Sequence, residues 1–400
     1  MTIPTYWGRS RSEPLDLEDV VYDHPTPVDE EGTLRRALES FRILKNKDFE
    51  IIVLAAATNQ AFEKLAQEKV KSIVRDFKNE YRIALLSYSD ISFIKNNLRG
   101  KVADDALELI NLYGYPNIRN MCLMAAHLRD AEAVILFDDD EIIKDPHYLD
   151  KATEFVGKTY QGEFVGGVAG WYERPEGGYL APLTGDWWWM EWQGSEAMNE
   201  AFSLISEPPR LKQTPFAFGG NAVIHKEVFM KIPFDPMITR GEDIDHLVNA
   251  KMFGYQFFLD RELWIKHLPP PGRVPDWLGF RQNVIRFVYM RAKLKSQHEV
   301  DGMKMVRAED LKPCPGRFLG DDLKEKVYKT SILLGVKHLL EGNDEDFCES
   351  LKNIEIARTI GESKESFDRY LKLQRVWEEL MSKLTWDEDL KAYLREKIET

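Results

Sequence analysis

The stretch Ala131-Glu-Ala-Val-Ile-Leu-Phe-Asp-Asp-Asp140 decides the fold, because a short apolar run ends there in three carboxylates. The run from Ala133 to Phe137 is too short for a membrane helix or a long amphipathic helix, and it predicts a buried strand. Open α/β sheets bind ligands at the carboxyl ends of their strands, so the three acids are expected at such a crevice. Adjacent carboxylates repel one another unless a cation lies among them, and Mg²⁺ or Mn²⁺ prefers oxygen ligands and often bridges phosphates. Taken alone, the acids also fit a solvated acidic turn.

Composition excludes several classes of protein. The chain has 400 residues, 44% of them hydrophobic and 30% charged, as in an ordinary soluble protein with a sizeable core. A net charge of −13 argues against a general nucleic-acid binder. Three widely spaced cysteines favour a reducing, cytoplasmic setting over a disulfide framework or a zinc site. No run approaches the roughly 18 apolar residues that span a bilayer, and the N-terminus lacks the apolar core of a signal peptide.

The segments before the acids predict a βαβ unit. Residues 49–57 form an almost continuous apolar run, which is typical of a central parallel strand covered on both faces. A helix is expected over residues 61–77 and a second strand over residues 82–87. The sequence therefore predicts an α/β fold with a mostly parallel central sheet flanked by helices.

Other polar and aromatic residues are candidates for ligand contact. Arg119 is expected at the start of a helix, where free N–H groups favour a phosphate, although a solvated arginine fits equally well. Gly219 and Gly220 allow the backbone to approach a ligand closely. Asp243 falls in the first turn of a predicted helix, where complementarity to the helix dipole also explains an acid. The tryptophans of residues 187–192 suit either a stacking platform for a sugar or the core, and burial in the core is the commoner role.

The order of these signals resembles the nucleotide-sugar-dependent glycosyltransferases of the GT-A fold, most closely the inverting family 2, over roughly residues 48–272. The most specific parts are Phe137-Asp-Asp-Asp140 and Gly241-Glu-Asp-Ile-Asp245, followed by Gly254-Tyr255 and His267. A bare Asp-x-Asp is common, whereas this spaced series is not.

The resemblance implies a role for each matching residue. Asp138 would lie near the ribose, and Asp140 would bind the Mn²⁺ or Mg²⁺ that holds the diphosphate. His267 would lie by the diphosphate and complete the metal shell together with Asp138 and Asp140. Asp243 would be the base that deprotonates the acceptor hydroxyl, with Glu242 beside it. The remaining donor contacts would be Ala57, Asn59, Asp90, Arg119, Asp139, Gly219 and Gly220, and weaker acceptor contacts would be Trp189, Trp192 and Asn221.

The same resemblance divides the chain into four parts. Residues 1–47 are expected to be an N-terminal extension without chemistry of its own, and residues 48–143 the nucleotide-sugar-binding half. Residues 144–275 would form the acceptor-binding half, and residues 276–400 an α-helical region. That region contains an apolar stripe from Phe367 to Leu384, an amphipathic face that needs a partner, and it is expected to serve stability, acceptor shaping or homo-oligomerisation.

The expected ligands are a UDP- or GDP-sugar donor and a small-molecule, glycan or lipid-linked acceptor. Two departures weaken the match: Ser87-Tyr-Ser-Asp90 stands where many relatives have Asp-Asp-Gly-Ser, and Ala55-Ala-Ala-Thr58 stands where a Pro-Thr pair is usual. Retaining GT-A enzymes also carry a late metal-binding histidine, so His267 leaves the stereochemistry open. The position of Asp243 favours inversion.

Three other functions compete with this interpretation. A phosphohydrolase of the haloacid-dehalogenase type would use Asp138 as nucleophile and Asp140 as acid and base, but that motif normally lies in the first strand. A nucleotidylyltransferase would need a glycine-rich loop after the first strand, which Ala55 to Asn59 does not provide. In a non-catalytic carbohydrate-binding protein, the acids would be ordinary surface residues.

Overall fold

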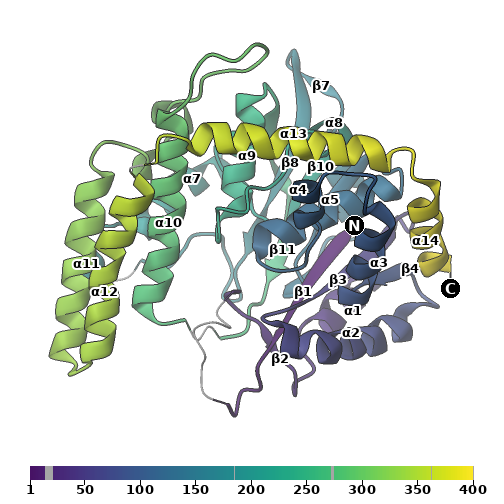
Figure 1. Cartoon of the computed structure of the whole chain (residues 1–400), viewed down its shortest axis with the longest axis horizontal. Coiled ribbons are helices and arrows are strands. Elements are labelled where there is room, and N and C mark those ends of the chain that lie inside the picture. The colour runs from purple at the N-terminus through teal and green to yellow at the C-terminus, as the bar shows by residue number, and fades with distance from the viewer. Residues whose placement is uncertain (14–20, 184, 272–273, 362, 400) are drawn as a thin grey trace.

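The computed structural model describes residues 1–13, 21–183, 185–271, 274–361 and 363–399, and these fold around one mixed sheet (Figure 1). The main strand order is β4-β3-β1-β5-β10-β8-β11-β6, with β2 beside β1, β7 beside β8 and β9 beside β11. The strands are β1 Thr2–Gly8, β2 Thr26–Pro27, β3 Glu50–Ala57, β4 Arg82–Leu86, β5 Ala133–Leu136, β6 Glu141–Ile142, β7 Thr159–Tyr160, β8 Glu163–Glu173, β9 Leu211–Gln213, β10 Ala222–His225 and β11 Gln256–His267.

Helices cover both faces of this sheet and make up the C-terminal region. They are α1 Leu34–Ser40, α2 Glu63–Phe77, α3 Tyr88–Leu98, α4 Asp104–Glu108, α5 Tyr115–Leu128, α6 Tyr148–Glu154, α7 Gly194–Phe202, α8 Lys226–Phe229, α9 Glu242–Met252, α10 Asp276–Lys295, α11 Leu323–Leu340, α12 Asp344–Gly361, α13 Ser366–Leu384 and α14 Glu388–Glu399. The predicted α/β architecture with a helical C-terminal region is confirmed.

The sheet is parallel in its first half and mixed in its second half. Strands β4, β3, β1 and β5 run parallel, and so do β8 and β11, whereas β10 is antiparallel to both of its neighbours. Along β3, Ile51 and Val53 pack into the cluster beneath α1, α2 and α6. Ile52 and Leu54 pack into the opposite cluster, with α3, α5, α9, α13 and α14. This two-sided burial explains why β3 is a continuous apolar run.

The strand in the middle of the sheet, β1, was not expected. It pairs in parallel with both β3 and β5, and all seven of its residues are buried. The expectation that residues 1–47 form an extension without chemistry is therefore wrong for this segment. The Pro-Thr pair that residues 55–58 lack is present in β1 as Pro4-Thr5.

Proline in this strand marks the place where the sheet opens. The carbonyl of Thr2 accepts a hydrogen bond from Phe137 N at 3.1 Å, so the backbone polar groups of Thr2 point towards β5. Because a strand has a two-residue period, the backbone of Pro4 is directed to the same neighbouring strand. Pairing between β1 and β5 consists of Thr2 with Leu136, so Pro4, which has no N–H, lies beyond it. The two strands separate at this point, and the acidic residues follow β5 into the opening.

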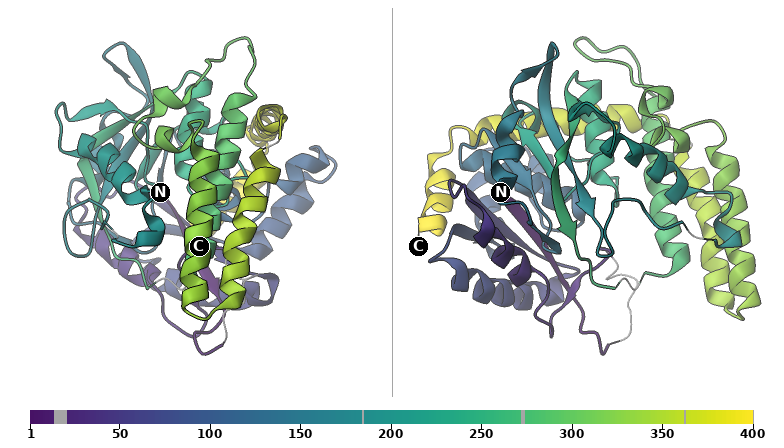
Figure 2. Two further views of the ribbon diagram at one scale, coloured as in Figure 1. Left: turned by 90° about the vertical axis from the view of Figure 1, so that its left-hand side faces the viewer. Right: turned by 180° about the vertical axis from the view of Figure 1, so that it is seen from behind.

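The C-terminal helices wrap the body (Figures 1 and 2). Helices α11 and α12 form a hairpin at one side, α13 crosses the molecule, and α14 packs against β4 and α5 at the other side. The apolar stripe of α13 is buried within the chain, with Trp377 Nε1 donating to Phe229 O at 2.9 Å and Tyr370 Oη to Pro233 O at 3.2 Å. The stripe thus has an intramolecular partner. Among the described helices, none is long and apolar enough to cross a membrane.

Candidate active site

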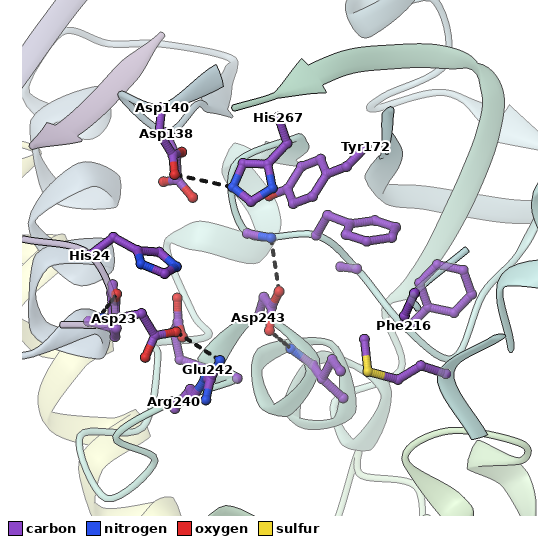
Figure 3. Close-up of a pocket in the computed structure, with 18 of the residues that line it drawn as sticks. Asp23, His24, Asp138, Asp140, Tyr172, Phe216, Arg240, Glu242, Asp243 and His267 are labelled. Carbon is purple, nitrogen blue, oxygen red and sulfur yellow. Dashed lines mark hydrogen bonds and ion pairs between the residues drawn. The ribbon is translucent and has the colours of Figure 1, made fainter. Parts of the chain in front are cut away.

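A cleft of about 490 Å³ opens at the edge of the sheet where β1, β5, β8 and β11 end (Figure 3). The loop before β10 and the first turn of α9 close its other side. The structure brings together eight of the predicted residues in its lining: Arg119, Asp138, Asp139, Asp140, Gly219, Glu242, Asp243 and His267.

Asp140 and His267 meet at one end of the cleft. Nε2 of His267 lies 3.2 Å from Oδ2 of Asp140, and the backbone amide of Leu268 donates to the carbonyl of Asp140 at 2.9 Å. The antiparallel pairing of β6 with β11 sets Glu141 opposite His267 and fixes this approach. Asp140 and His267 were predicted to belong to one site although they are 127 positions apart in the sequence, and they are in contact in the structure.

This pair fits a divalent ion that arrives with a ligand. Within the described residues, no three His, Cys, Asp or Glu side chains are gathered closely enough to hold an ion by themselves. Mg²⁺ and Mn²⁺ are commonly held by one or two protein ligands, with substrate phosphates and water completing the shell. The carboxylate of Asp140 and the imidazole of His267 are suitable ligands of this kind.

Asp138 is held by Arg119. Nη1 and Nη2 of Arg119 lie 2.8 and 3.1 Å from the two carboxylate oxygens of Asp138, and Nε lies 3.2 Å from Oε1 of Glu242. Arg119 lies in the second turn of α5, which begins at Tyr115, so the prediction that it marks a helix start is wrong. Its buried guanidinium joins the end of β5 to α9, and it is already paired with two carboxylates. As a consequence, Asp138 is less available than Asp140 to a metal ion.

The three acids lie in the turn that follows β5 and have different partners. Oδ2 of Asp139 accepts a hydrogen bond from the Thr5 hydroxyl of β1. Burial and the neighbouring Asp140 raise the pKa of Asp139 to about 8. This carboxyl supports the turn from beneath.

A fourth carboxyl, that of Glu141, was missed by the sequence analysis. It is fully buried, its Oε2 accepts a hydrogen bond from the backbone N–H of Asp138 at 2.9 Å, and its Oε1 has no hydrogen-bond partner among the described residues. Burial and the charges of Asp138 and Asp140 raise the pKa of Glu141 well above its ordinary value. Its place next to the triplet in the sequence was the available signal.

The candidate base projects from the first turn of α9. Gly241 caps this helix with a φ of 71°, a left-handed conformation that favours glycine. The carboxylate of Asp243 accepts hydrogen bonds from Gly219 N at 2.9 Å and Ile244 N at 2.8 Å, which orients it along the cleft. Burial raises the pKa of Asp243, and burial together with the charge of Asp243 raises the pKa of Glu242 to about 7. Both shifts make these carboxylates better proton acceptors near neutral pH.

The two glycines of the loop before β10 permit close approach. A Cβ on Gly219 would lie 2.8 Å from Nη2 of Arg119, and a Cβ on Gly220 would lie 2.2 Å from Oε1 of Glu141. Gly220 lies behind Asp138 and does not line the cleft itself. Its backbone N–H donates a hydrogen bond to the hydroxyl of Tyr172, and Tyr172 does line the cleft.

Three further residues that were predicted to contact the nucleotide-sugar donor lie outside the cleft lining. Ala57 is buried at the end of β3, and the side chain of Asn59 caps the turn that follows it. Asp90 forms a capping box with Ser87 at the start of α3 and lies 2.7 Å from Nζ of Lys397 in α14. The structure thus shows a structural role for Asp90, and its donor contact stays a prediction.

The predicted acceptor residues are also structural. Trp192 is 2% exposed and stacks on Phe318 at 4.8 Å, and Trp189 packs edge-on against Phe280. Asn221 is completely buried, and its amide accepts a hydrogen bond from the Tyr148 hydroxyl at 2.9 Å. None of the three lines the cleft, so their acceptor roles stay predictions without support from its geometry, and the alternative of core packing fits Trp192.

Residues from the N-terminal segment complete the cleft. Tyr6, Asp23 and His24 line it, and Oδ2 of Asp23 lies 3.0 Å from Nη2 of Arg240 (Figure 3). The sequence analysis missed them because it found no periodicity before residue 33. Pro4-Thr5 was the one available signal that this segment enters the sheet.

Comparison with known proteins gives likeness at the level of the fold. No protein-family model matches the sequence, and no curated protein matches it. A mannosyltransferase from Pyrobaculum calidifontis, solved with GDP-Man and Mn²⁺, is 14% identical with a TM-score of 0.42, over 98% of this chain and 86% of that one. Glucosyl-3-phosphoglycerate synthase from Mycobacterium tuberculosis, solved with Mn²⁺, UDP-glucose and phosphoglyceric acid, is 16% identical with a TM-score of 0.35, over 72% and 77%. Because these likenesses are distant, the roles of the site residues rest on the geometry of the cleft.

Proposed function

We propose that this protein is a metal-dependent glycosyltransferase that moves a hexosyl group from a UDP- or GDP-sugar to an acceptor hydroxyl. The observation that supports it most is the placement of the Asp140–His267 pair and the Asp243 carboxylate in one cleft. The first suits a divalent ion with a diphosphate, and the second suits a hydroxyl that must lose its proton.

The residues divide the work between leaving group and nucleophile. Asp140 and His267 would hold a Mn²⁺ or Mg²⁺ ion, which would supply positive charge to neutralise the departing nucleoside diphosphate. The carboxylate of Asp243 accepts the proton of the acceptor hydroxyl as that oxygen attacks the anomeric carbon. Gly219 fixes this carboxylate through its N–H, and the buried pair of Arg119 with Glu242 holds the helix that carries it. Direct attack of this kind inverts the anomeric carbon.

The competing phosphohydrolase mechanism fits the geometry less well. Its nucleophile would be Asp138, but both oxygens of that carboxylate contact Arg119 at 2.8 and 3.1 Å. Asp140 would be its acid and base, but it lies against His267. Asp138 and Asp140 are therefore both engaged by other side chains, and they are not free to act as nucleophile and as acid and base.

The experiment is a panel of UDP- and GDP-sugars with Mn²⁺ or Mg²⁺, scored by thermal unfolding and by release of the nucleoside diphosphate. A true donor at 100 times its dissociation constant stabilises the protein by about 2.7 kcal/mol. Release of UDP or GDP that requires the metal and stops in Asp140→Asn supports the proposal. Equal release by Asp140→Asn and by the exposed-site control Asp301→Asn would contradict it. An axial-to-equatorial change at the transferred sugar's anomeric carbon, read by NMR, distinguishes inversion from retention.

A further inference from the structure

One arginine of the cleft, Arg286, forms no ion pair with any of the described residues. Arg286 of α10 lines the cleft beside Gly241 and Cys314, and a Cβ on Gly241 would lie 2.3 Å from its Nη1. The guanidinium therefore lies directly against the turn that starts α9, the helix of the candidate base.

The other arginines of the lining each have a carboxylate within 4.0 Å. Arg119 lies 2.8 Å from Asp138, Arg240 lies 3.0 Å from Asp23, and Arg174 lies 3.8 Å from Glu176. Arg286 has no such ion pair within the described part of the chain, and its Nε is buried without a hydrogen-bond partner. Its guanidinium rests on the ring of Phe287, 4.3 Å from the ring centre.

Arg286 is partly exposed to the cleft, and its buried Nε is the part of the cation that lacks a partner among the described residues. Burial, and after it the charge of Arg240, lower the pKa of Arg286 to about 10, which still leaves it charged at neutral pH. Unpaired buried charges are retained where a ligand or partner supplies the opposite charge. A planar guanidinium suits a carboxylate or a phosphate, each of which accepts two parallel hydrogen bonds.

We propose that Arg286 binds an anionic group, a carboxylate or a phosphate ester, on the acceptor substrate. This inference rests on the proposed function, in which Asp243 accepts the proton of the hydroxyl of that same acceptor molecule. The carboxylate of Asp243 and the guanidinium of Arg286 influence each other electrostatically, but they form no ion pair among the described contacts. A hydroxyl and an anion that reach both groups belong to one small molecule. The acceptor class is therefore a small hydroxylated acid or phosphate ester.

The geometry also separates this subsite from the predicted metal end. Nη1 of Arg286 lies against Gly241, the residue that caps the helix carrying Asp243. A negative charge bound at Arg286 would therefore lie at the Asp243 end of the cleft.

The test compares three probes built on the same three-carbon chain, one neutral and two anionic: glycerol, glycerate and glycerol 3-phosphate. Each is titrated by calorimetry, in EDTA so that no metal captures the anion, into the wild-type protein and the variants Arg286→Met and Arg291→Met. Arg291 is a matched control, because it lies on the same helix and is paired with Asp321 at 3.0 Å outside the cleft. Arg286→Lys keeps the charge but loses the planar fork, and it serves as a conservative variant that preserves the fold.

The wild-type protein is expected to bind glycerate or glycerol 3-phosphate and to bind glycerol much more weakly. Arg286→Met should weaken the anion at least tenfold, Arg286→Lys should lie between it and the wild type, and Arg291→Met should change the affinity less than twofold. Equal affinities in Arg286→Met and Arg291→Met would overturn the inference, and so would a wild-type protein that prefers neither anion over glycerol. If Arg286→Met fails to fold, an anion affinity of Arg286→Lys equal to that of the wild type overturns it.

The proposed function is tested separately by titrating UDP and GDP with Mn²⁺. If the wild-type protein binds neither UDP nor GDP in the presence of Mn²⁺, the proposed glycosyltransferase function is contradicted. The difference in anion affinity between Arg286→Met and Arg291→Met would still decide whether an anion site exists. Arg286→Met should leave the affinity for UDP or GDP with Mn²⁺ unchanged, because the nucleotide occupies the other end of the cleft.

Discussion

Four consecutive acids, Asp138 to Glu141, meet four different environments within one turn. Asp138 is paired with Arg119, and Asp140 lies against His267. Asp139 is buried against Thr5, and Glu141 is buried beneath the backbone of Asp138. The surroundings of each carboxyl, and not its residue type, therefore separate Asp140, the proposed metal ligand, from the acids that support the turn.

The raised pKa of Asp139 predicts how the metal-free protein responds to pH. Because the folded state holds this proton up to about pH 8 and the unfolded chain releases it near pH 4, stability is lost as the pH rises through this window. Asp139→Asn should remove this loss and stabilise the metal-free protein at pH 8 by an amount on the order of a few kcal/mol. Urea unfolding at pH 5 and pH 8 measures it. If wild type and Asp139→Asn lose stability in parallel between these pH values, the buried carboxyl is not the cause.

The candidate base predicts a pH-dependent rate. Burial raises the pKa of Asp243 and brings that of Glu242 to about 7, so kcat/KM should rise with pH through about 7 and then level off. Asp243→Asn should lower kcat by roughly 10²- to 10⁴-fold while the affinity for the nucleotide stays unchanged. Initial rates between pH 5 and 9, with nucleotide titrations on the same variants, provide the measurement. A rate that is independent of pH in the wild type, or full activity in Asp243→Asn, would assign the base elsewhere.

At the scale of elements, a buried ion cluster fixes α9 to α10. Nζ of Lys293 lies 2.8 Å from Asp245 and 3.2 Å from Asp235, and all three side chains are essentially inaccessible to solvent. Asp245, the last acid of the Gly-Glu-Asp-Ile-Asp motif, thus holds the helix whose first turn carries the candidate base.

Removal of that lysine should be severe. Lys293→Met leaves two buried carboxylates without a partner and should lower the free energy of unfolding by about 3–5 kcal/mol. Lys295→Met, at an exposed ion pair with Asp321 on the same helix, should cost less than about 1 kcal/mol. Chemical denaturation of both variants at pH 7 compares them, and similar losses would show that the cluster does not hold α9.

The loop before β10 makes a second prediction at this scale. Gly220→Ala places a methyl group against Glu141 and Asp138, at 2.2 and 2.7 Å, so the loop or the acidic turn must move. We expect the substitution to destabilise the protein by about 1–3 kcal/mol and to weaken metal-dependent nucleotide binding. Gly279→Ala in α10 meets open space and should raise stability by about 0.5–1 kcal/mol. Thermal unfolding of the two variants compares the stability change at the crowded position, Gly220, with that at the open position, Gly279.

Apolar runs with two-sided burial could be predicted from the sequence, and isolated short segments could not. β3 and β5 were recognised because every residue packs on a helix, and α2 because its apolar residues repeat at helical spacing. β1 has only seven residues, two of them threonine and one proline, and it is followed by a segment without periodicity. Its place beside β5 is a long-range contact that no local pattern records.

The same limit explains the errors in the site. Asp140, His267 and Asp243 were found because spaced motifs carry them, whereas Asp23 and Arg286 belong to no motif and enter the cleft through tertiary packing. Arg119 was placed at a helix start because Gly114 to Asn120 appeared to be a break. In the structure, the break is Gly114 alone, with a φ of 81°, and α5 begins at the next residue.

At the scale of the molecule, segments distant in sequence close around one cleft. The Asp23–Arg240 pair links the N-terminal segment to the start of α9, and Arg119 links α5 to both β5 and α9. Helix α13 spans the body and buries its apolar face on elements from both halves of the sheet. The cleft is thus built by the whole chain, and Arg286 brings a C-terminal helix into it.

The central claim is that Asp140 and His267 hold a divalent ion together with a nucleoside diphosphate. Calorimetric titration of UDP and GDP into the protein, with Mn²⁺ and with EDTA, tests it most directly. The wild-type protein should bind one of the two nucleotides only when Mn²⁺ is present, and Asp140→Asn and His267→Ala should each weaken that binding at least tenfold, while Asp301→Asn leaves it unchanged. Nucleotide binding that is the same in EDTA as in Mn²⁺, or the same in Asp140→Asn as in Asp301→Asn, would contradict the account.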